Sequence, residues 1–467
     1  MDVKQKYKLA QIKKHKKSLS DKNNISLNEM IGSEKFQSII SECRDFRDRI
    51  YTPLKTLFIF IKQVLNPDKS CKNAVAELAA EQLITEGKVI STNTGSYSNA
   101  RQRLPEQSVS ELVKEIGKIP AKKAPSSWKA FGRPLKGVDG STVIMPDTKE
   151  NQEIFPQLPG QKKGIGFPIA RMVVVMSLTV GTVLDYAIGA FKGKGTGESS
   201  LLRSIFDCIE QDDILLGDRY YPSFFLIADV LAKGADGIFR GQAQRHYDFR
   251  KGQSLGKKDH IVEWIKPKKS IWMTMTQEMY DAYPDKIKVR EFKVNGVIYV
   301  TTLLDHKKYN KKELARVYEL RWHLEINLKI IKDTMNMDVL SCKTPDMVRK
   351  EIGIHFLAYN FIRIIMAEAC AQHDTIPNHV SFKGTVQLLN KFMPHFIHLS
   401  SKKNQIMYAE LLKNIVNNRI GNRPGRIEPR RVKKRPKPFD TLNRPRFIEK
   451  AKLERKLQRM ISRNAEA

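Results

Sequence analysis

Four polar side chains that could act together on a phosphate lie in one short stretch: Tyr318, Arg321, Glu325 and Lys332. Residues 318–332 contain no proline or glycine and are rich in Leu, Glu and Lys, which predicts a helix. A helix advances about 100° per residue, so the four side chains fall within roughly 60° of one another. On such an edge a carboxylate can hold Mg²⁺, while guanidinium and ammonium groups hold a phosphodiester. A solvated helix face with ordinary ion pairs has the same composition, so the charges alone leave both interpretations open.

The same helix carries a separate apolar stripe, which we expect to face a core. Its members are Leu320, Leu324, Leu328, Ile331 and Met335. The helix is therefore predicted to be buried on one side and to present its polar edge beside the buried side.

Two aspartates precede this helix in segments with the pattern of β-strands. Asp139 lies within residues 135–145, with hydrophobic residues on both sides, and Asp218 directly follows the short apolar run 213–217. Carboxylates on adjacent strands could share divalent cations with Glu325. An Asp-Gly pair is also common in turns, and an aspartate after a strand often caps the next helix. Both alternatives stay open for a single residue.

The three segments together resemble a known family. The spacing of the Tyr-Arg-Glu-Lys set, the sequence DGS at 139–141 and the sequence GDRYY at 217–221 occur in the family's order. They resemble the DDE transposases of bacterial insertion sequences that carry the YREK signature, which form the IS-four family. The resemblance covers roughly residues 90 to 440, and it also includes the segment SNARQRLP at 98–105.

The resemblance implies a role for each of these polar residues. Asp139, Asp218 and Glu325 would be the catalytic carboxylates and the ligands of two Mg²⁺ ions about 4 Å apart, for which Mn²⁺ can substitute. Four further residues would contact DNA: Tyr318, Arg321, Lys332 and Arg219.

The resemblance also implies a reaction and its partners. The enzyme would nick double-stranded DNA at the terminal inverted repeats of its element and free a 3′-OH. That hydroxyl would form a hairpin end, and the opened end would be joined to target DNA. Cutting two ends together implies a DNA-bridged homodimer. Two alternatives remain: a nucleic-acid-binding protein that has lost catalysis, and a nuclease without strand transfer.

The composition fits a folded protein with a polyanionic partner. The chain has 467 residues, and its hydrophobic content of 41% is enough to build a core, which excludes a disordered chain. Its formal net charge of +32 favours a polyanionic partner such as nucleic acid. Residues 1–30 carry eight lysines, and residues 419–467 carry 17 Lys and Arg against five acids. Each is either a solvated tail or a contact to the DNA backbone. Ribosomal and membrane-surface proteins share this bias, so charge alone does not choose among them.

Neither a secreted nor a membrane protein is expected. The N-terminus is basic and polar, and the longest apolar runs, near 57–65 and 172–184, are too short to span a bilayer. The five cysteines are widely spaced and form no CxxC pair, which fits a reducing compartment. We expect a cytoplasmic, nucleoid-associated protein with no membrane partner.

The residue pattern changes along the chain from helical to strand-like and back to helical, which predicts an α/β protein. A helical N-terminal DNA-binding domain is expected over 1–120 and a Pro-rich linker over 121–134. A catalytic domain is expected over 135–370, with a β-rich insertion at 240–300, and a helical C-terminal region with a basic tail over 371–467. The order of strands and helices in the catalytic domain is that of a ribonuclease-H-like mixed sheet.

Several elements are specific enough to be tested. Gly181 marks the junction of a predicted hairpin, and the last helix before the linker is expected to end near Ile116. The other strands are expected at 135–145, 213–217 and 235–240, and the helices at 198–208, 222–233 and 348–371.

Some aromatic and histidine residues have a functional and a packing interpretation. His355 and Tyr359, in the apolar helix, are expected to be core residues rather than ligands. Trp264, Trp272 and Tyr299 could hold a flipped base, but core packing is the better expectation for each.

Overall fold

The computed structural model of the chain describes residues 26–44, 46, 49–270, 275–396, 400–421 and 441–465. The expectations for the basic arm up to residue 25, for the tail segment 422–440 and for Trp272 therefore lie outside the described residues.

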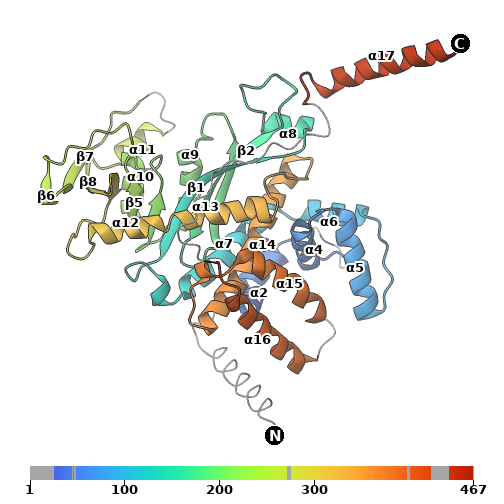
Figure 1. Cartoon of the computed structure of the whole chain (residues 1–467), viewed down its shortest axis with the longest axis horizontal. Coiled ribbons are helices and arrows are strands. Elements are labelled where there is room, and N and C mark those ends of the chain that lie inside the picture. The colour runs from blue at the N-terminus through green and yellow to red at the C-terminus, as the bar shows by residue number, and fades with distance from the viewer. Residues whose placement is uncertain are drawn as a thin grey trace, which may run out of the picture.

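A single nine-stranded sheet runs through the described part of the chain, in the order β3-β2-β1-β4-β5-β9-β8-β7-β6. In Figure 1 it extends from β6, β7 and β8 at one end of the molecule to β1 and β2 near the middle. Strand β1 pairs antiparallel with β2 and parallel with β4, which itself is parallel to β5. The sheet therefore changes direction at β1. Its strands are β1 (Leu135–Ile144), β2 (Ile169–Ser177), β3 (Val183–Ala190), β4 (Ile214–Gly217), β5 (Asp236–Arg240), β6 (Gln253–Gly256), β7 (Asp259–Ile265), β8 (Lys286–Val294) and β9 (Val297–Thr301).

The first five strands lie where the sequence predicts them. β2 and β3 form the expected antiparallel hairpin, and Gly181 at its turn has a φ of 84°, which favours glycine. The segment 240–300 is β-rich, as predicted, and contains the short helix α11 (Gln277–Asp281). β9 pairs antiparallel with β5, so the insertion extends the sheet.

Two clusters of buried side chains lie on the two faces of the sheet. Helices α9 (Glu198–Ser204) and α10 (Phe224–Ala232) contribute to one cluster, together with Val138 of β1. The other cluster contains Leu135 and residues from α7 (Glu106–Lys123), α13 (Trp322–Lys329) and α14 (Pro345–Gln372). Because neighbouring residues of a strand point to opposite faces, β1 separates the two clusters. The helix predicted at 222–233 is α10, which begins after its capping residue Ser223, so the predicted first residue, Pro222, lies outside the helix.

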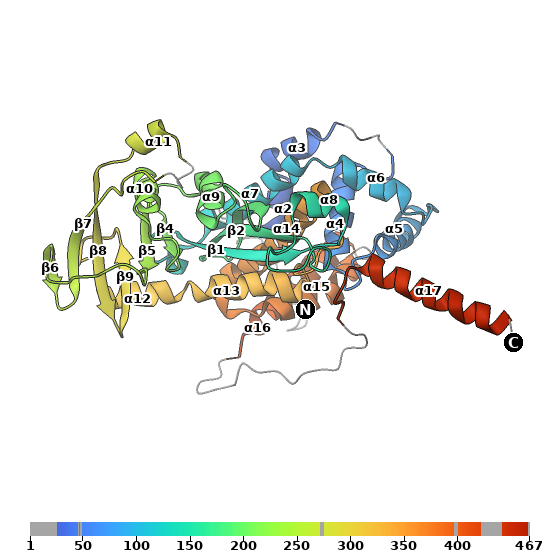
Figure 2. The same ribbon diagram turned by 90° about the horizontal axis from the view of Figure 1, so that it is seen from above.

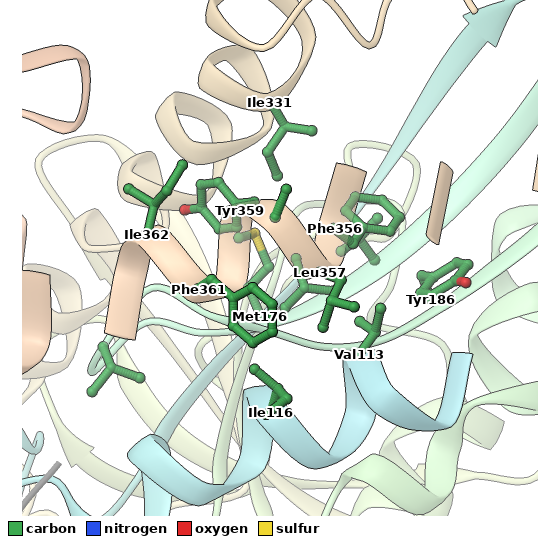
Figure 3. Close-up of a cluster of buried hydrophobic side chains, with 14 of the residues drawn as sticks. Val113, Ile116, Met176, Tyr186, Ile331, Phe356, Leu357, Tyr359, Phe361 and Ile362 are labelled. Carbon is green, nitrogen blue, oxygen red and sulfur yellow. The ribbon is translucent and has the colours of Figure 1, made fainter. Parts of the chain in front are cut away.

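Helix α14 (Pro345–Gln372) is the centre of the larger cluster. Figure 3 shows side chains of α7, β2 and α14 packed together, among them Ile116, Met176 and Leu357. His355 and Tyr359 are fully buried, which confirms that they are core residues. In the part of the chain that the structure describes, α14 alone is long and apolar enough to cross a membrane, but 94% of its apolar window is buried inside the protein.

Some N-terminal helices share this core, whereas α5 and α6 form a small separate cluster with one side of α4, which includes Val75 and Tyr97. Phe36 of α3, Phe60 of α4 and Val109 of α7 belong to the same cluster as α14. α7 continues beyond Ile116, where we expected it to end, and Pro120 lies buried inside the helix, which packs on α14 and β3. The helices are α2 (Leu27–Ile31), α3 (Glu34–Ser41), α4 (Pro53–Leu65), α5 (Cys71–Glu86), α6 (Gly95–Arg103) and α7 (Glu106–Lys123).

The C-terminal region is helical, as expected. α15 and α16 pack on each other and on α14, whereas α17 extends away from the body (Figures 1 and 2). Helix α17 was not predicted; it begins just after Pro445, where the prolines of the tail end. The bounds are α15 (Phe382–Phe396), α16 (Ser401–Asn417) and α17 (Arg446–Ala465); the remaining short elements are α8 (Lys149–Ile154) and the 3₁₀ turns Ser126–Trp128, Phe206–Cys208 and Pro377–His379.

Candidate active site

The two aspartates lie side by side at the point where the sheet changes direction. Gly137 of β1 pairs with Leu216 of β4 in a parallel register, and continuing that register sets Asp139 level with Asp218. Crevices at such switch points, beyond the carboxyl ends of parallel strands, are common ligand sites. Asp139 pairs with Val174 in the middle of a strand, so it is not a turn residue.

Asp218 has no capping role in the helix that follows it. Ser223, not Asp218, accepts the hydrogen bond from the backbone amide of Leu226 at the start of α10. Asp218 instead accepts a hydrogen bond from the backbone amide of Tyr220 at 2.8 Å. This contact fixes the turn after β4 and leaves the other carboxylate oxygen available.

The predicted single helix over 318–332 is interrupted. α12 (Lys311–Glu319) ends, α13 (Trp322–Lys329) begins after Arg321, and the π-helical turn η3 (Ile330–Thr334) follows. The amides of Leu320 and Arg321 bond three residues back rather than four, which tightens the backbone. Residues three apart then eclipse each other, and this brings Tyr318 and Arg321 together.

The predicted apolar stripe is correct except at one end. Leu320 is 38% exposed, because the tightened turn rotates it away from the core. Leu324 is fully buried and lies over Gly137, where an added Cβ would be 3.1 Å from a Leu324 methyl group. Gly137 thus lets α13 approach β1 closely, which places Glu325 near Asp139.

Arg321 connects the helix to the strand. Its guanidinium pairs with Glu325 and lies 3.8 Å from a carboxylate oxygen of Asp139. It also lies 5.9 Å from the centre of the Tyr318 ring, which packs edge-on against Tyr299. These side chains are partly buried, so they are not a solvated helix face.

The surroundings of Asp139 disfavour the ionised form of its carboxyl group. Burial raises its pKa from 3.8 to about 6, the nearby charges of Asp218 and Glu325 add to this rise, and Arg321 opposes it. The three carboxylates are therefore within electrostatic reach of one another. Perturbed carboxylates of this kind concentrate at functional sites.

The oxygen donors of this site suit a divalent cation, but they do not form a finished cage. Among the described residues, no group of three or more acidic, His or Cys side chains converges closely enough to hold a metal ion. Arg321 lies between Glu325 and Asp139 and pairs with the former. The buried, repelling carboxylates fit a hard cation chemically, and the metal site remains a prediction.

The other two predicted DNA contacts are Lys332 and Arg219. Lys332 is half-buried in η3, and its side chain forms no hydrogen bond, ion pair or ring contact with another described residue. Arg219 is exposed and lines a cavity of 340 Å³ with Arg240 and Arg245, among other residues. The cavity adjoins the turn that carries Asp218.

The structure adds Glu198, which the sequence did not point to, and gives Tyr221 of the GDRYY segment a contact with it. The carboxylate of Glu198 lies against Gly140, and the hydroxyl of Tyr221 donates to it at 3.3 Å. A glutamate after a glycine-rich loop has no distinctive spacing, so no sequence signal identified it. Trp264 and Tyr299 are 2% and 7% exposed, which confirms core packing for both.

Comparison with known proteins decides the family. The family described as "Transposase DDE domain" matches residues 132–361, which include β1, β4 and α13. The chain is 25% identical to the transposase InsG of insertion sequence element IS4 from Escherichia coli K12, over 73% of this chain and 77% of that protein. The chain is a DDE transposase. Its resemblance to the IS4 transposases, read from the three motifs, is confirmed.

Shorter matches link the transposase to other elements. It is 26% identical over 72 residues to the putative transposase InsL of element IS186A and to the transposase of element IS421, both from Escherichia coli. The matched part is 20% and 19% of those proteins. As a DDE transposase, the protein belongs to enzymes that act on the DNA of an insertion sequence and generally use divalent metal ions.

Proposed function

We propose that this transposase moves its insertion sequence by a cut-and-paste reaction. It nicks DNA at the element's terminal inverted repeats, forms a hairpin end through the freed 3′-OH, and joins the opened end to target DNA. The observation that carries the proposal is the placement of Asp139 level with Asp218 at the switch point of the sheet, with Arg321 joining Asp139 to Glu325.

We infer a ribonuclease-H-like catalytic domain over residues 135–370. The support is the order β3-β2-β1-β4-β5, with β1 antiparallel to β2 and parallel to β4. A helical N-terminal DNA-binding domain over 1–120, a linker over 121–134 and a C-terminal region over 371–467 complete the proposed division.

Asp139, Asp218 and Glu325 would hold two Mg²⁺ ions, or Mn²⁺ in their place. Such ions, when bound, activate an attacking hydroxyl and stabilise the leaving oxygen of a phosphodiester. Asp139 is the best candidate for a shared ligand, because both other carboxylates raise its pKa. A general-base histidine is not required by this proposal.

The cationic residues around the carboxylates would hold the DNA backbone. Arg321 would exchange its contacts with Glu325 and Asp139 for a phosphate, which a guanidinium can bind through two hydrogen bonds. Lys332 would contribute a point charge, and Tyr318 would support the guanidinium through its ring. Arg219 would contact the backbone of a DNA strand that enters the cavity beside the turn of Asp218.

The proposed partners are double-stranded DNA at the element's ends and at the target. Two ends must be cut together, so we propose a homodimer bridged by DNA, acting in the cytoplasm at the nucleoid. The net charge of +32 supports contacts to the phosphate backbone of both the element's ends and the target DNA.

The test uses linear DNA that carries the ends of this chain's own element. The wild-type protein and a Glu325→Ala variant are compared with Mg²⁺, with Mn²⁺ and with chelator. Flush cleavage, hairpin ends and joined target products that need both the cation and Glu325 support the proposal. Cleavage without joining would indicate a nuclease, and salt-sensitive binding without cleavage would indicate a DNA-binding protein.

A further inference from the structure

Glu198 is presented to the catalytic strand by a glycine-rich loop that is anchored at both ends. Arg171 of β2 donates a hydrogen bond to the backbone carbonyl of Thr196 at 3.1 Å, and its guanidinium lies 4.7 Å from the centre of the Phe191 ring. Glu198 then begins α9. The loop therefore delivers this carboxylate to a defined place.

That place is the backbone of β1, next to the first catalytic aspartate. A Cβ built on Gly140 would lie 2.4 Å from the carboxyl carbon of Glu198, so a residue with a side chain cannot occupy this position without displacing the glutamate. Gly140 directly follows Asp139, and its amide donates to Asp139 at 2.9 Å. The glutamate thus packs on the peptide that orients Asp139.

The other contact of Glu198 leads to the second aspartate. The hydroxyl of Tyr221 donates to the Glu198 carboxylate at 3.3 Å, and Tyr221 is only 1% exposed. Its backbone amide donates to the carbonyl of Asp218 at 3.3 Å, which closes the turn after β4. Burial raises the pKa of Tyr221, and the charges of Glu198, Asp139 and Asp218 raise it further. The phenol therefore stays protonated and remains a donor.

We propose that Glu198 and Tyr221 are a pair of positioning residues that hold Asp218 at a fixed distance from Asp139. Glu198 contacts the strand of one aspartate and, through Tyr221, the turn of the other. The inference rests on the proposed function, because two aspartates that share cations tolerate little change in their separation. Partners behind the metal ligands commonly matter in this way.

The experiment compares Glu198→Ala, Glu198→Gln, Tyr221→Phe and the double variant Glu198→Ala/Tyr221→Phe with wild type. Glu278→Gln, an exposed glutamate in the first turn of the short helix α11, is the matched control. Two quantities are measured: the cleavage rate on DNA with the element's ends in Mg²⁺ and in Mn²⁺, and Mn²⁺ binding by the DNA-free protein from its electron paramagnetic resonance signal. Thermal melting of each variant identifies those that fail to fold.

We expect Glu198→Ala to lose about 10- to 100-fold in Mg²⁺-dependent cleavage and to bind Mn²⁺ more weakly by a similar factor. The loss should be smaller in Mn²⁺, because Mg²⁺ demands stricter geometry. Glu198→Gln keeps an oxygen that accepts from Tyr221, so it should stay within about fivefold of wild type. The double variant should be no worse than Glu198→Ala, since the two residues act as one unit.

Two results would overturn the proposal. In the first, Glu198→Ala binds Mn²⁺ and cleaves as wild type does, which would show that the pair has no positioning role. In the second, Glu198→Gln cleaves DNA and binds Mn²⁺ as poorly as Glu198→Ala does, while Tyr221→Phe is normal. That result would show that the Glu198 carboxylate binds the cation directly. If wild type itself fails to cleave, the proposed function fails, and the Mn²⁺ binding comparison still decides the role of the pair.

Discussion

Replacing Asp139 by asparagine should stabilise the protein while abolishing its reaction. The asparagine would keep the shape of the side chain and the hydrogen bond from the Gly140 amide, which reaches Asp139 at 2.9 Å. It would remove a charge that burial and two neighbouring carboxylates disfavour, despite the attraction of Arg321. Catalytic carboxylates that crowd together in this way lower the stability of the folded state.

The size and sign of the effect follow from the pKa. The pKa of Asp139 is about 6 in the folded protein against an ordinary 3.8, and about 1.4 kcal/mol per pH unit makes this about 3 kcal/mol. The folded pKa is raised, so stability falls as pH rises from about 4 to about 6, and the whole cost is present above pH 6. The side chain is 23% exposed, so solvent screening brings the expected gain to about 1–3 kcal/mol.

The assay is denaturant unfolding of wild type and Asp139→Asn at pH 8, 5 and 4. The variant should be more stable at pH 8, its advantage should shrink at pH 5, and it should nearly vanish at pH 4. Asp333→Asn, which alters an exposed carboxylate on η3, should change stability little at any pH. Cleavage by Asp139→Asn should be lost throughout.

A variant that is equally or less stable than wild type at pH 8 would refute this reasoning. A gain of the same size at all three pH values would also refute it, because the effect would then not depend on ionisation.

Three other perturbations test separate parts of the structure. Gly140→Ala should cost about 1–3 kcal/mol of unfolding free energy through the clash with Glu198, and adding Glu198→Ala should restore part of it in the same unfolding assay. Arg290→Leu should cost about 3–5 kcal/mol, because it leaves the buried Asp259 without its paired guanidinium at 2.8 Å; an unchanged denaturation midpoint would contradict this. Arg245→Ala should reduce the salt dependence of DNA binding by about one counterion if its cavity holds a phosphate, measured by titration at several salt concentrations.

Much of the site is visible in local sequence because local chemistry decides it. The hydrophobic residues on both sides of Asp139 predicted its strand, and the short apolar run before Asp218 predicted the next. Leu324, Leu328 and Ile331 follow the helical period, and all three are buried. These patterns depend only on residues near one another in the chain.

The errors arise where packing overrides the local pattern. Leu320 fits the apolar period, but a tightened backbone before α13 turns it outward. Pro120 indicates a break, yet α7 continues past it because the helix packs on α14 and β3. The residues next to Leu320 and Pro120 in the sequence predict neither the tightened turn nor the continued helix.

The types of the proposed catalytic groups, their order and the elements that carry them can be read from the sequence, because strand and helix periods are local properties. Which of these groups meet depends on the tertiary structure. The parallel register of β1 and β4 sets Asp139 level with Asp218, and the small size of Gly137 brings Glu325 to them. Glu198 reaches Gly140 from a loop more than fifty residues away in the chain. A contact of that kind depends on the pairing of β1 with β2 and of β2 with β3, and on the space that Gly140 leaves by having no side chain.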